Sequence, residues 1–331
     1  MTAQREDPAG SGRRRVGAQP AQAPERWVSV TPSTARSPRG RRLGDPVQPG
    51  AVLDQPDSEI SSRPRALIMD VAGAYMRPLG GWFPVAALVE LMNELGVDDQ
   101  ATRSAVSRIT KRGLLSGEAR EGVRGYRLTE VALTRLEDAE RRIFTNVGPA
   151  PLEQGWVVVS FSIPEAERDK RHQLRSRLEW LGFGNLSNGL WFAPSRSWPA
   201  LQEDLERMQL SSYVTAFRAD HLGPEPLPAL VARCWDLDRL RAMYDDFLET
   251  SIPVQKKWSR RREAAGGEES FVDYTLALYR WRKFPYLDPG LPGQVLPRGW
   301  EGARAAEVFF DLHARLRDAA HAHARSVVCS V

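Results

Sequence analysis

The hydrophobic pattern predicts three consecutive helices between residues 64 and 113. The first helix ends where Pro78, Gly80 and Gly81 follow its apolar positions. Its apolar face comprises Leu67, Ile68, Val71, Ala74 and Tyr75. The second begins at Pro84, because proline is favoured in the first turn of a helix, and Gly96 ends it. Its apolar face comprises Leu88, Leu91, Met92 and Leu95.

The third helix is predicted within DDQATRSAVSRITKRGLL, residues 98–115. Asp98 or Asp99 can accept hydrogen bonds from the free amides of its first turn, and Gly113 ends it. Its apolar side comprises Ala101, Ala105, Val106 and Ile109. Its opposite side carries Gln100, Arg103, Ser104, Ser107 and Lys111, with Arg108 on the flank. A helix of this composition suits an anionic surface.

Two short strands are predicted directly after this helix, over residues 114–119 and 125–129, around a turn that contains Gly and Arg. Three helices followed by a hairpin is the order of a winged helix-turn-helix domain, whose reading helix enters a major groove about 12 Å wide. From Asp98 to Arg127 seven cations and four anions leave a net charge of +3, against +4 for the whole chain. The net positive charge of this segment alone is therefore nearly as large as that of the whole chain.

We expect eight residues of this segment to contact DNA. They are Gln100, Arg103, Ser104, Ser107, Arg108, Lys111, Arg120 and Arg124. Arg103 and Gln100 can make bidentate contacts with guanine and adenine edges, whereas Ser104, Ser107 and Lys111 can reach bases or phosphates. The remaining three, Arg108 and the hairpin arginines, suit the DNA backbone. The alternative is that this face is simply solvated, as charged helix faces usually are.

Composition places the chain among soluble intracellular proteins. Its 331 residues suffice for two or three domains. Cys234 and Cys329 cannot form a disulfide framework, and no Cys and His cluster has zinc-ligand spacing, so we expect a reducing cytoplasm and neither metal nor cofactor. No signal sequence and no run of about 18 apolar residues occurs. We expect a cytoplasmic, nucleoid-associated protein with no membrane contact.

Residues 1–63 are predicted to be a disordered leader rich in Arg, Pro and Gly. Its arginine clusters, residues 13–15 and 39–42, lie among residues that cannot bury enough apolar surface to order the chain. Two interpretations are open. The leader is either an extension without function or a basic arm that adds non-specific attraction to phosphate.

The rest of the chain predicts an α+β, multidomain protein. A helix over residues 130–145 and the linker NVGPAP precede the order β-α-β-α-β, with one strand open to being split, which indicates a ferredoxin-like domain. The segments after Pro224 are mostly helical. The expected parts are the leader at 1–63, a winged helix at 64–148, a ferredoxin-like domain at 149–223 and a helical effector and dimerisation domain at 224–331.

A candidate effector site lies beside the Pro- and Gly-rich stretch at residues 285–300. Its residues are Arg280, Trp281, Arg282, Lys283 and Tyr286. Cations next to aromatic rings suit a ligand that carries phosphates and an aromatic or acyl group. The alternative is a structural loop that covers a helix end, with the aromatic residues in the core.

Three stretches resemble the PaaX family of bacterial transcriptional regulators, whose namesake represses phenylacetate catabolism genes. They are KRGLL with GYRLT, then FSIPE with RHQLRSRLEWLGFG and GLWFAP, then FPYLDPGLPGQVLPRGWEG, within residues 65–316. The resemblance implies a winged helix that binds operator DNA, a ferredoxin-like middle domain similar to CRISPR-associated small nucleases, and a helical C-terminal domain. It also implies a dimer that an aryl-acetyl coenzyme A thioester releases from DNA.

Carried over residue by residue, the DNA contact of the family falls on the helix with Arg103, Ser104, Ser107 and Arg108. The sequence also departs from the family pattern. Tyr279 stands where a histidine is common two positions before the tryptophan of the WRKF segment, and the Arg-rich leader lies outside the pattern. The effector or the response of this protein can therefore differ from those of the family.

The sequence favours a regulator over an enzyme. A nuclease related to the middle domain would need a metal-binding Asp at the end of the first strand, where this chain has Ser160 to Ile163 without a carboxylate. An enzyme that acts on an acyl-CoA thioester would need a positioned nucleophile and base, and the five histidines form no recognisable triad, so we expect no catalytic residues. We expect a homodimeric repressor that places two helices about 34 Å apart on an inverted repeat. A regulator or activator controlled by a protein partner, without a small ligand, is the alternative.

Overall fold

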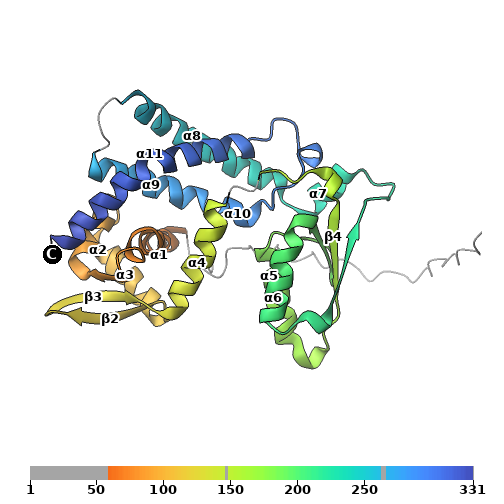
Figure 1. The fold of residues 1–331 in the computed structure, drawn as a ribbon, viewed down its shortest axis with the longest axis horizontal. Coiled ribbons are helices and arrows are strands. Elements are labelled where there is room, and N and C mark those ends of the chain that lie inside the picture. The colour runs from red at the N-terminus through yellow and green to blue at the C-terminus, as the bar shows by residue number, and fades with distance from the viewer. Residues whose placement is uncertain (1–58, 146–147, 262–265, 331) are drawn as a thin grey trace, which may run out of the picture. The chain divides into compact units, whose positions relative to one another are not determined.

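The computed structural model describes residues 59–145, 148–261 and 266–330. It is a mixed α+β structure with two antiparallel sheets and a mostly helical C-terminal part (Figure 1). Residues 1–58 of the predicted leader lie outside the described residues. Residues 59–63, which the composition assigns to the leader, instead form the first turn of helix α1, Glu59–Val71.

The N-terminal elements follow the predicted order with one addition. After α1 they are a π-helical turn at Ala72–Met76, strand β1 at Trp82–Pro84, α2 at Val85–Glu94, α3 at Asp99–Lys111, β2 at Leu115–Arg120, β3 at Val123–Leu128 and α4 at Glu130–Phe144. Strand β1 is the addition. Pro84 ends this strand and is the N-cap residue of α2, not its first helical residue. The three predicted helices and the hairpin are all present.

The first sheet has the antiparallel order β1-β3-β2. The two-residue turn between β2 and β3 consists of Glu121 and Gly122, both with positive φ, the combination that suits the right-handed twist of a hairpin. Strand β1 joins the sheet because Gly125 of β3 leaves room for the indole of Trp82 and for the backbone of Phe83. The Trp82 indole also donates a hydrogen bond to the Glu118 carbonyl, at 3.2 Å.

The middle part has the order β-α-β-β-α-β. Its elements are β4 at Trp156–Phe161, α5 at Arg168–Trp180, β5 at Gly184–Ser187, β6 at Leu190–Pro194, α6 at Trp198–Arg207 and β7 at Val214–Ala219. The sheet order is β5-β6-β4-β7, antiparallel throughout. The strand that the sequence left open to being split is therefore two strands, β5 and β6, which form a hairpin. One face of the sheet packs against α5 and α6 through Val157, Val159 and Trp191.

The C-terminal part consists mostly of helices. They are α7 at Leu227–Cys234, α8 at Leu237–Arg260, α9 at Gly267–Trp281, α10 at Phe284–Leu287 and α11 at Gly302–Cys329. Short 3-10 turns lie at Leu152–Gln154, Glu165–Glu167, Ser195–Ser197, Ser211–Tyr213 and Gly293–Val295. In the described part of the chain no helix is both long and apolar enough to cross a membrane.

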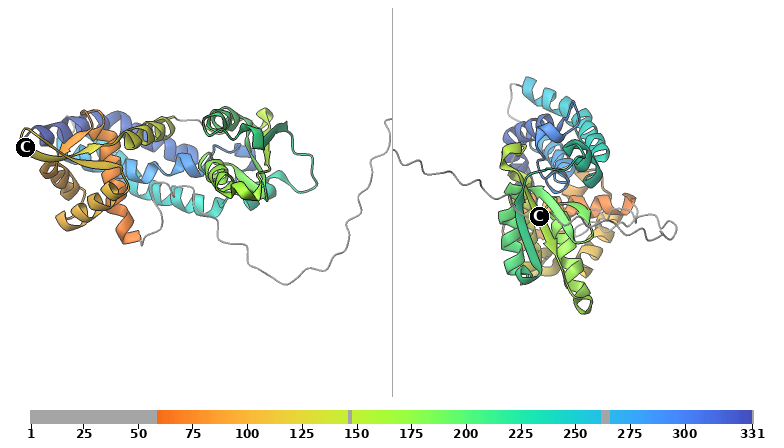
Figure 2. Two further views of the ribbon diagram at one scale, coloured as in Figure 1. Left: turned by 90° about the horizontal axis from the view of Figure 1, so that it is seen from below. Right: turned by 90° about the vertical axis from the view of Figure 1, so that its right-hand side faces the viewer.

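One hydrophobic core joins the N-terminal helices to α8–α11. It extends from Leu67 to Ile143 and from Leu240 to Val327, and α9 and α11 lie side by side with α2 next to α11 (Figure 1, Figure 2). Polar contacts cross the same seam, since the Tyr75 and Thr275 hydroxyls lie 2.7 Å apart. We call these elements, α1–α4 with α8–α11, the helical body.

A second set of cores belongs to β4–β7 and α5–α7, which we call the sheet body. The core between the sheet and helices α5 and α6 contains residues from 157 to 210 only. The other face of the sheet carries Trp156 and Phe192, which pack against Val231 and Trp235. The loop that follows α10, residues 288–300, adds Leu291 and Val295 to this outer core.

Replacing Gly125 by Ala should destabilise the protein, because a Cβ there would lie 2.5 Å from the Phe83 carbonyl oxygen and overlap the Trp82 ring. We expect a cost of about 1 to 3 kcal/mol, as for other overpacked positions. Thermal unfolding should show a lower Tm. Gly117→Ala in β2 is the matched control, because its Cβ would meet nothing within 4 Å. Equal Tm values for the two variants would contradict this account of β1.

Stability should fall as the pH drops below about 6.5, the ordinary pKa of histidine. Burial lowers the pKa of His313 and of His321 on α11, which pack against Phe144 and Tyr75. A depressed folded-state pKa stabilises the protein above the unfolded value, and this contribution is lost as the pH falls through the folded value.

The double variant His313→Gln with His321→Gln should therefore show a flatter dependence of unfolding free energy on pH between 7 and 5. Urea titrations at several pH values measure this slope. His172→Gln on α5, where the side chain is exposed, should leave the slope unchanged. A wild-type slope in the double variant would exclude the two histidines as its source.

Candidate nucleic-acid interface and interbody cleft

Local contacts fix the position of α3 at its first turn. The Asp98 carboxylate accepts a hydrogen bond from the Ala101 amide at 2.8 Å, so Asp98, rather than Asp99, is the cap of the two candidates. The Asn93 side chain of α2 donates to Asp99 at 3.0 Å. Below them, Ala105, Val106 and Ile109 are buried, together with Thr102. The amphipathic pattern therefore orients the helix as the periodicity predicts.

The six α3 residues expected to meet DNA are all exposed. They are Gln100, Arg103, Ser104, Ser107, Arg108 and Lys111. Within this face, the Arg108 guanidinium donates to the Ser104 hydroxyl at 3.3 Å. The other side of the helix is buried, so the polar residues form one continuous surface. The structure thus brings the predicted α3 residues together.

The two hairpin arginines differ in their surroundings. Arg120 pairs with Glu118 at 2.6 Å and lies 5.0 Å over the Trp82 ring, and Arg127 approaches the same carboxylate at 3.4 Å. Hydrogen bonds from Arg120, and then from Arg127, hold the pKa of Glu118 below its ordinary value. The charge of Arg120 is therefore partly compensated, by two residues, Trp82 and Glu118, that the sequence analysis did not single out.

Arg124 is exposed on β3 and borders the same shallow groove as Arg103 of α3. The groove also has the carboxylates Glu90, Glu94 and Asp99 along it. The imidazole of His323 on α11 contacts Glu94 at 2.9 Å. Burial raises the pKa of Glu94, and the contact with His323 opposes that shift. The two arginines that the sequence assigns to different roles therefore lie close together, next to acidic residues.

Helix α4 is tied to the end of α3. The Thr129 hydroxyl, which caps α4 by accepting a hydrogen bond from the Ala132 amide, donates to the Gly113 carbonyl at 2.7 Å. The backbone amide of Thr129 also donates to the Leu114 carbonyl at 3.2 Å. A displacement of the start of α4 would therefore act directly on the residues that end α3.

The five residues expected to bind an effector do not line one common cavity. Trp281 is buried, stacks on Phe309 and donates to the Ile143 carbonyl at 3.2 Å. Arg282 is buried and pairs with Asp70 of α1 at 3.0 Å. Each of the other three contacts a different neighbour. The Arg280 guanidinium donates to the Leu276 carbonyl, the Lys283 ammonium lies over the Tyr279 ring, and the Tyr286 ring lies under the Arg142 guanidinium. Only Trp281 borders the cleft described next.

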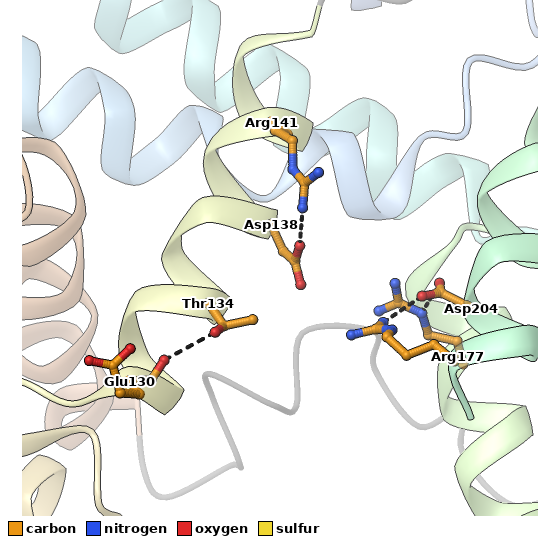
Figure 3. Close-up of polar contacts among 7 residues, drawn as sticks. Glu130, Thr134, Asp138, Arg141, Arg177 and Asp204 are labelled. Carbon is orange, nitrogen blue, oxygen red and sulfur yellow. Dashed lines mark hydrogen bonds and ion pairs between the residues drawn. The ribbon is translucent and has the colours of Figure 1, made fainter. Parts of the chain in front are cut away.

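A cleft of about 790 Å³ lies between the helical body and the sheet body. Its arginines are Arg141, Arg142, Arg177, Arg196 and Arg207, and its aromatic residues include Trp180, Tyr244, Trp281, Phe284 and Trp300. Figure 3 shows two ion pairs on opposite walls, Asp138 with Arg141 on α4 and Asp204 with Arg177. Asp204 is buried and also binds Arg207 at 2.5 Å. The cleft therefore combines aromatic residues with arginines, and five carboxylates also line it: Asp138, Glu203, Asp204, Asp288 and Glu307.

Arg142 is the cleft arginine with the most enclosed guanidinium. Its Nε donates to the Pro285 carbonyl at 2.8 Å, and its Cζ lies 4.4 Å from the Trp180 ring and 4.9 Å from the Tyr286 ring. Burial lowers its pKa to about 10, so it remains charged at neutral pH. It forms no ion pair with any carboxylate of the residues that the structure describes.

No group of three or more His, Cys, Asp or Glu side chains suited to a metal ion occurs among the described residues. Asp288 at the floor of the cleft accepts hydrogen bonds from the Tyr244 hydroxyl at 3.0 Å and from the Gly290 amide at 2.8 Å. Burial raises the pKa of both Asp288 and Tyr244. This buried carboxylate serves to hold the loop at residues 288–300 in shape.

Comparison with known proteins finds three family matches in consecutive parts of the chain. They are a PaaX-like protein at residues 63–132, the PaaX protein central Cas2-like domain at 149–231 and the PaaX-like protein C-terminal domain at 235–326. A curated relative, the transcriptional repressor PaaX of Escherichia coli strain K12, is 27% identical over 259 residues. The match covers 77% of this chain and 81% of the relative.

A solved structure, the uncharacterized protein Rv0674 from Mycobacterium tuberculosis, is similar with a TM-score of 0.44 and 22% identity. That match covers 75% of this chain and 96% of the other.

Proposed function

The chain belongs to the PaaX family and is a transcriptional regulator, and we propose that it is a sequence-specific DNA-binding repressor that reads duplex DNA with α3. The observation that carries the proposal is the surface of α3, where six polar residues are exposed while the opposite side is buried. In this role the protein has no enzymatic activity. It acts in the cytoplasm, on the DNA of the nucleoid.

The order α1-β1-α2-α3-β2-β3 supports a winged helix-turn-helix, in which β2 and β3 form the wing. In this assignment Arg103 and Gln100 contact base edges, and Arg124 contacts phosphate. Arg120 can contact a phosphate only if its ion pair with Glu118 is partly broken. The contribution of Arg120 should therefore be smaller than that of Arg124.

The middle part, residues 149–223, is assigned as a ferredoxin-like domain, because β-α-β-β-α-β with an antiparallel sheet is that topology. We place the winged helix at residues 59–148 and the effector and dimerisation part at 224–331. A homodimer would set two α3 helices about 34 Å apart, one turn of DNA, on an inverted repeat.

For release from DNA we propose an aryl-acetyl coenzyme A thioester bound in the cleft. The volume of about 790 Å³ falls within the usual range for ligand sites. Arginines on both walls suit phosphates, and the aromatic floor suits the acyl group. This site differs from the one expected from the sequence: Trp281 borders the cleft, whereas Arg280, Arg282, Lys283 and Tyr286 do not line it.

Two substitutions separate base reading from general attraction. Arg103→Ala should cost about 1 to 3 kcal/mol on the bound genomic sequence and relax one base preference. Arg124→Ala should weaken binding to all duplexes alike and lower the salt slope by about one. Titrations of selected genomic fragments and scrambled duplexes over a salt series measure both effects.

Arg239→Ala, at the exposed start of α8, is the control and should change neither quantity. Sequence-blind losses of equal size from Arg103→Ala and Arg124→Ala would show that α3 does not read bases. Absence of any preference for genomic fragments in the wild-type protein would refute the proposed function itself.

A ligand of the cleft should raise thermal stability. At 100 times its Kd, a bound thioester adds about 2.7 kcal/mol. Ala200→Trp on α6 should remove this shift by filling the cleft, whereas Gln202→Trp on the same helix lies outside the cleft lining and should retain it. If phenylacetyl-CoA and other acyl-CoA thioesters leave the Tm of the wild-type protein unchanged, control by a protein partner is favoured instead.

A further inference from the structure

We propose that Arg142 and Trp180 form the latch of a joint between the helical body and the sheet body, and that the loop at residues 288–300 is the fixed anchor of this joint. Opening the latch turns the sheet body relative to α3 without deforming α3. The joint does not require DNA in order to exist. Its role in controlling DNA binding rests on the proposed function.

Separate cores make each body a rigid unit. The core of the helical body contains buried residues only from 67–143 and 240–327, so the α3 side and the C-terminal helices are packed as one piece. The core beneath α5 and α6 contains residues only from 157–210. Because closely packed interiors resist continuous deformation, relative movement concentrates where the two bodies meet.

One junction between the bodies is tight and apolar. Leu237 at the start of α8, together with Leu291 and Val295 of the loop, is buried in one core with Trp156 and Phe192 of the sheet. The guanidinium of Arg196 donates to the Pro289 and Gly290 carbonyls at 3.1 and 2.8 Å. Gly290 has a φ of +69°, and a Cβ there would overlap that guanidinium. Side chains and backbone interlock here, which makes this junction the anchor.

The other junction is small and depends on Arg142. The Trp180 side chain of α5 lies 4.4 Å from the Arg142 guanidinium and meets the Tyr286 ring edge to face at 5.3 Å. Arg142 forms no ion pair with a carboxylate of the described residues, so it is attracted to the sheet body by the Trp180 ring and, at longer range, by the charge of Asp204. Such a contact is weaker than the apolar anchor.

Charge repulsion further weakens the latch. Arg177 lies 3.7 Å from the same indole, and its charge contributes to the lowered pKa of Arg142. Asp204 offsets this repulsion by pairing with Arg177. All four residues border the cleft, so a ligand that contacts them directly alters the balance that holds the latch closed.

The adjacent residue on α4 provides a control of the same chemistry. Arg141 is also a cleft arginine, but it is exposed and pairs with Asp138 on its own helix at 2.5 Å. Within the described parts of the chain it forms no hydrogen bond or ion pair with the sheet body. Removing Arg141 therefore changes the charge of the cleft by the same amount as removing Arg142 while leaving the junction intact.

Distances between spin labels on the full chain test the joint. One label is placed on Cys329, the exposed native cysteine at the end of α11, and the other on Ser212→Cys, an exposed position of the sheet body. Cys234→Ser removes the remaining thiol. A second pair, Cys329 with Glu137→Cys on α4, reports on the helical body alone.

We call Cys329 with Ser212→Cys the cross-body pair. In this pair, Arg142→Ala and Trp180→Ala should each increase the fraction of molecules whose label distance differs from that of the wild type. The increase should be roughly two- to fivefold, as expected for loss of a cation–π contact. The double variant should add nothing to Trp180→Ala, because both act through one contact. Arg141→Ala should match the wild type. The pair within the helical body should not change in any variant.

An unchanged cross-body distance in folded Arg142→Ala, or a double variant that exceeds Trp180→Ala, overturns the latch. Circular dichroism establishes folding. If Arg142→Ala does not fold, Arg142→Gln and Trp180→Leu remove the charge and the ring while keeping most of the side-chain volume, and wild-type distances in both would also overturn it. If the variants show altered distances but the wild-type protein prefers no DNA sequence, the proposed function is refuted and the joint is still supported.

Discussion

The structure depends on the apolar core shared by the N-terminal helices and α8–α11. Leu67, Phe83, Phe247 and Phe309 are fully buried within it, and burying a side chain of this size contributes about 1.5 to 3 kcal/mol. Segments at opposite ends of the described chain therefore stabilise each other. As a consequence, the proposed reading helix is an outer face of a large body rather than part of a small independent domain.

This core determines which charges remain available at the surface. Arg282 is buried in the helical body, where it forms an ion pair with Asp70. In the cleft, Arg177 forms an ion pair with Asp204. The arginines of α3 instead project from a helix whose other face is buried, and Arg103 lies in a groove that Glu90, Glu94 and Asp99 also line. Charge in the sequence is spread over the chain, and the fold exposes the polar and basic side chains of α3 where the packing demands an amphipathic helix.

The sequence predicts elements well and their partners poorly. Periodicity and capping place α3 and its cap Asp98, because both signals are local. Strand β1 has three residues, too few to show alternation, and its pairing depends on Gly125 far along the chain. The role of Arg282 could not be predicted, because its partner Asp70 lies 212 residues away. An aromatic and basic segment beside a proline-rich loop looks available for a ligand until the core that contains it is known.

A rigid helical body constrains how any signal could control DNA binding. A ligand shifts an equilibrium only by its differential affinity for two states, so the two states must differ where the ligand binds. Refolding α3 would break the shared core, at a cost far above typical coupling energies of 1 to 3 kcal/mol. Rotation at a small Arg–aromatic contact costs much less. In the proposed homodimer such a rotation would change the spacing of the two α3 helices while leaving each helix intact, and the two helices would then no longer match two half-sites at the same time.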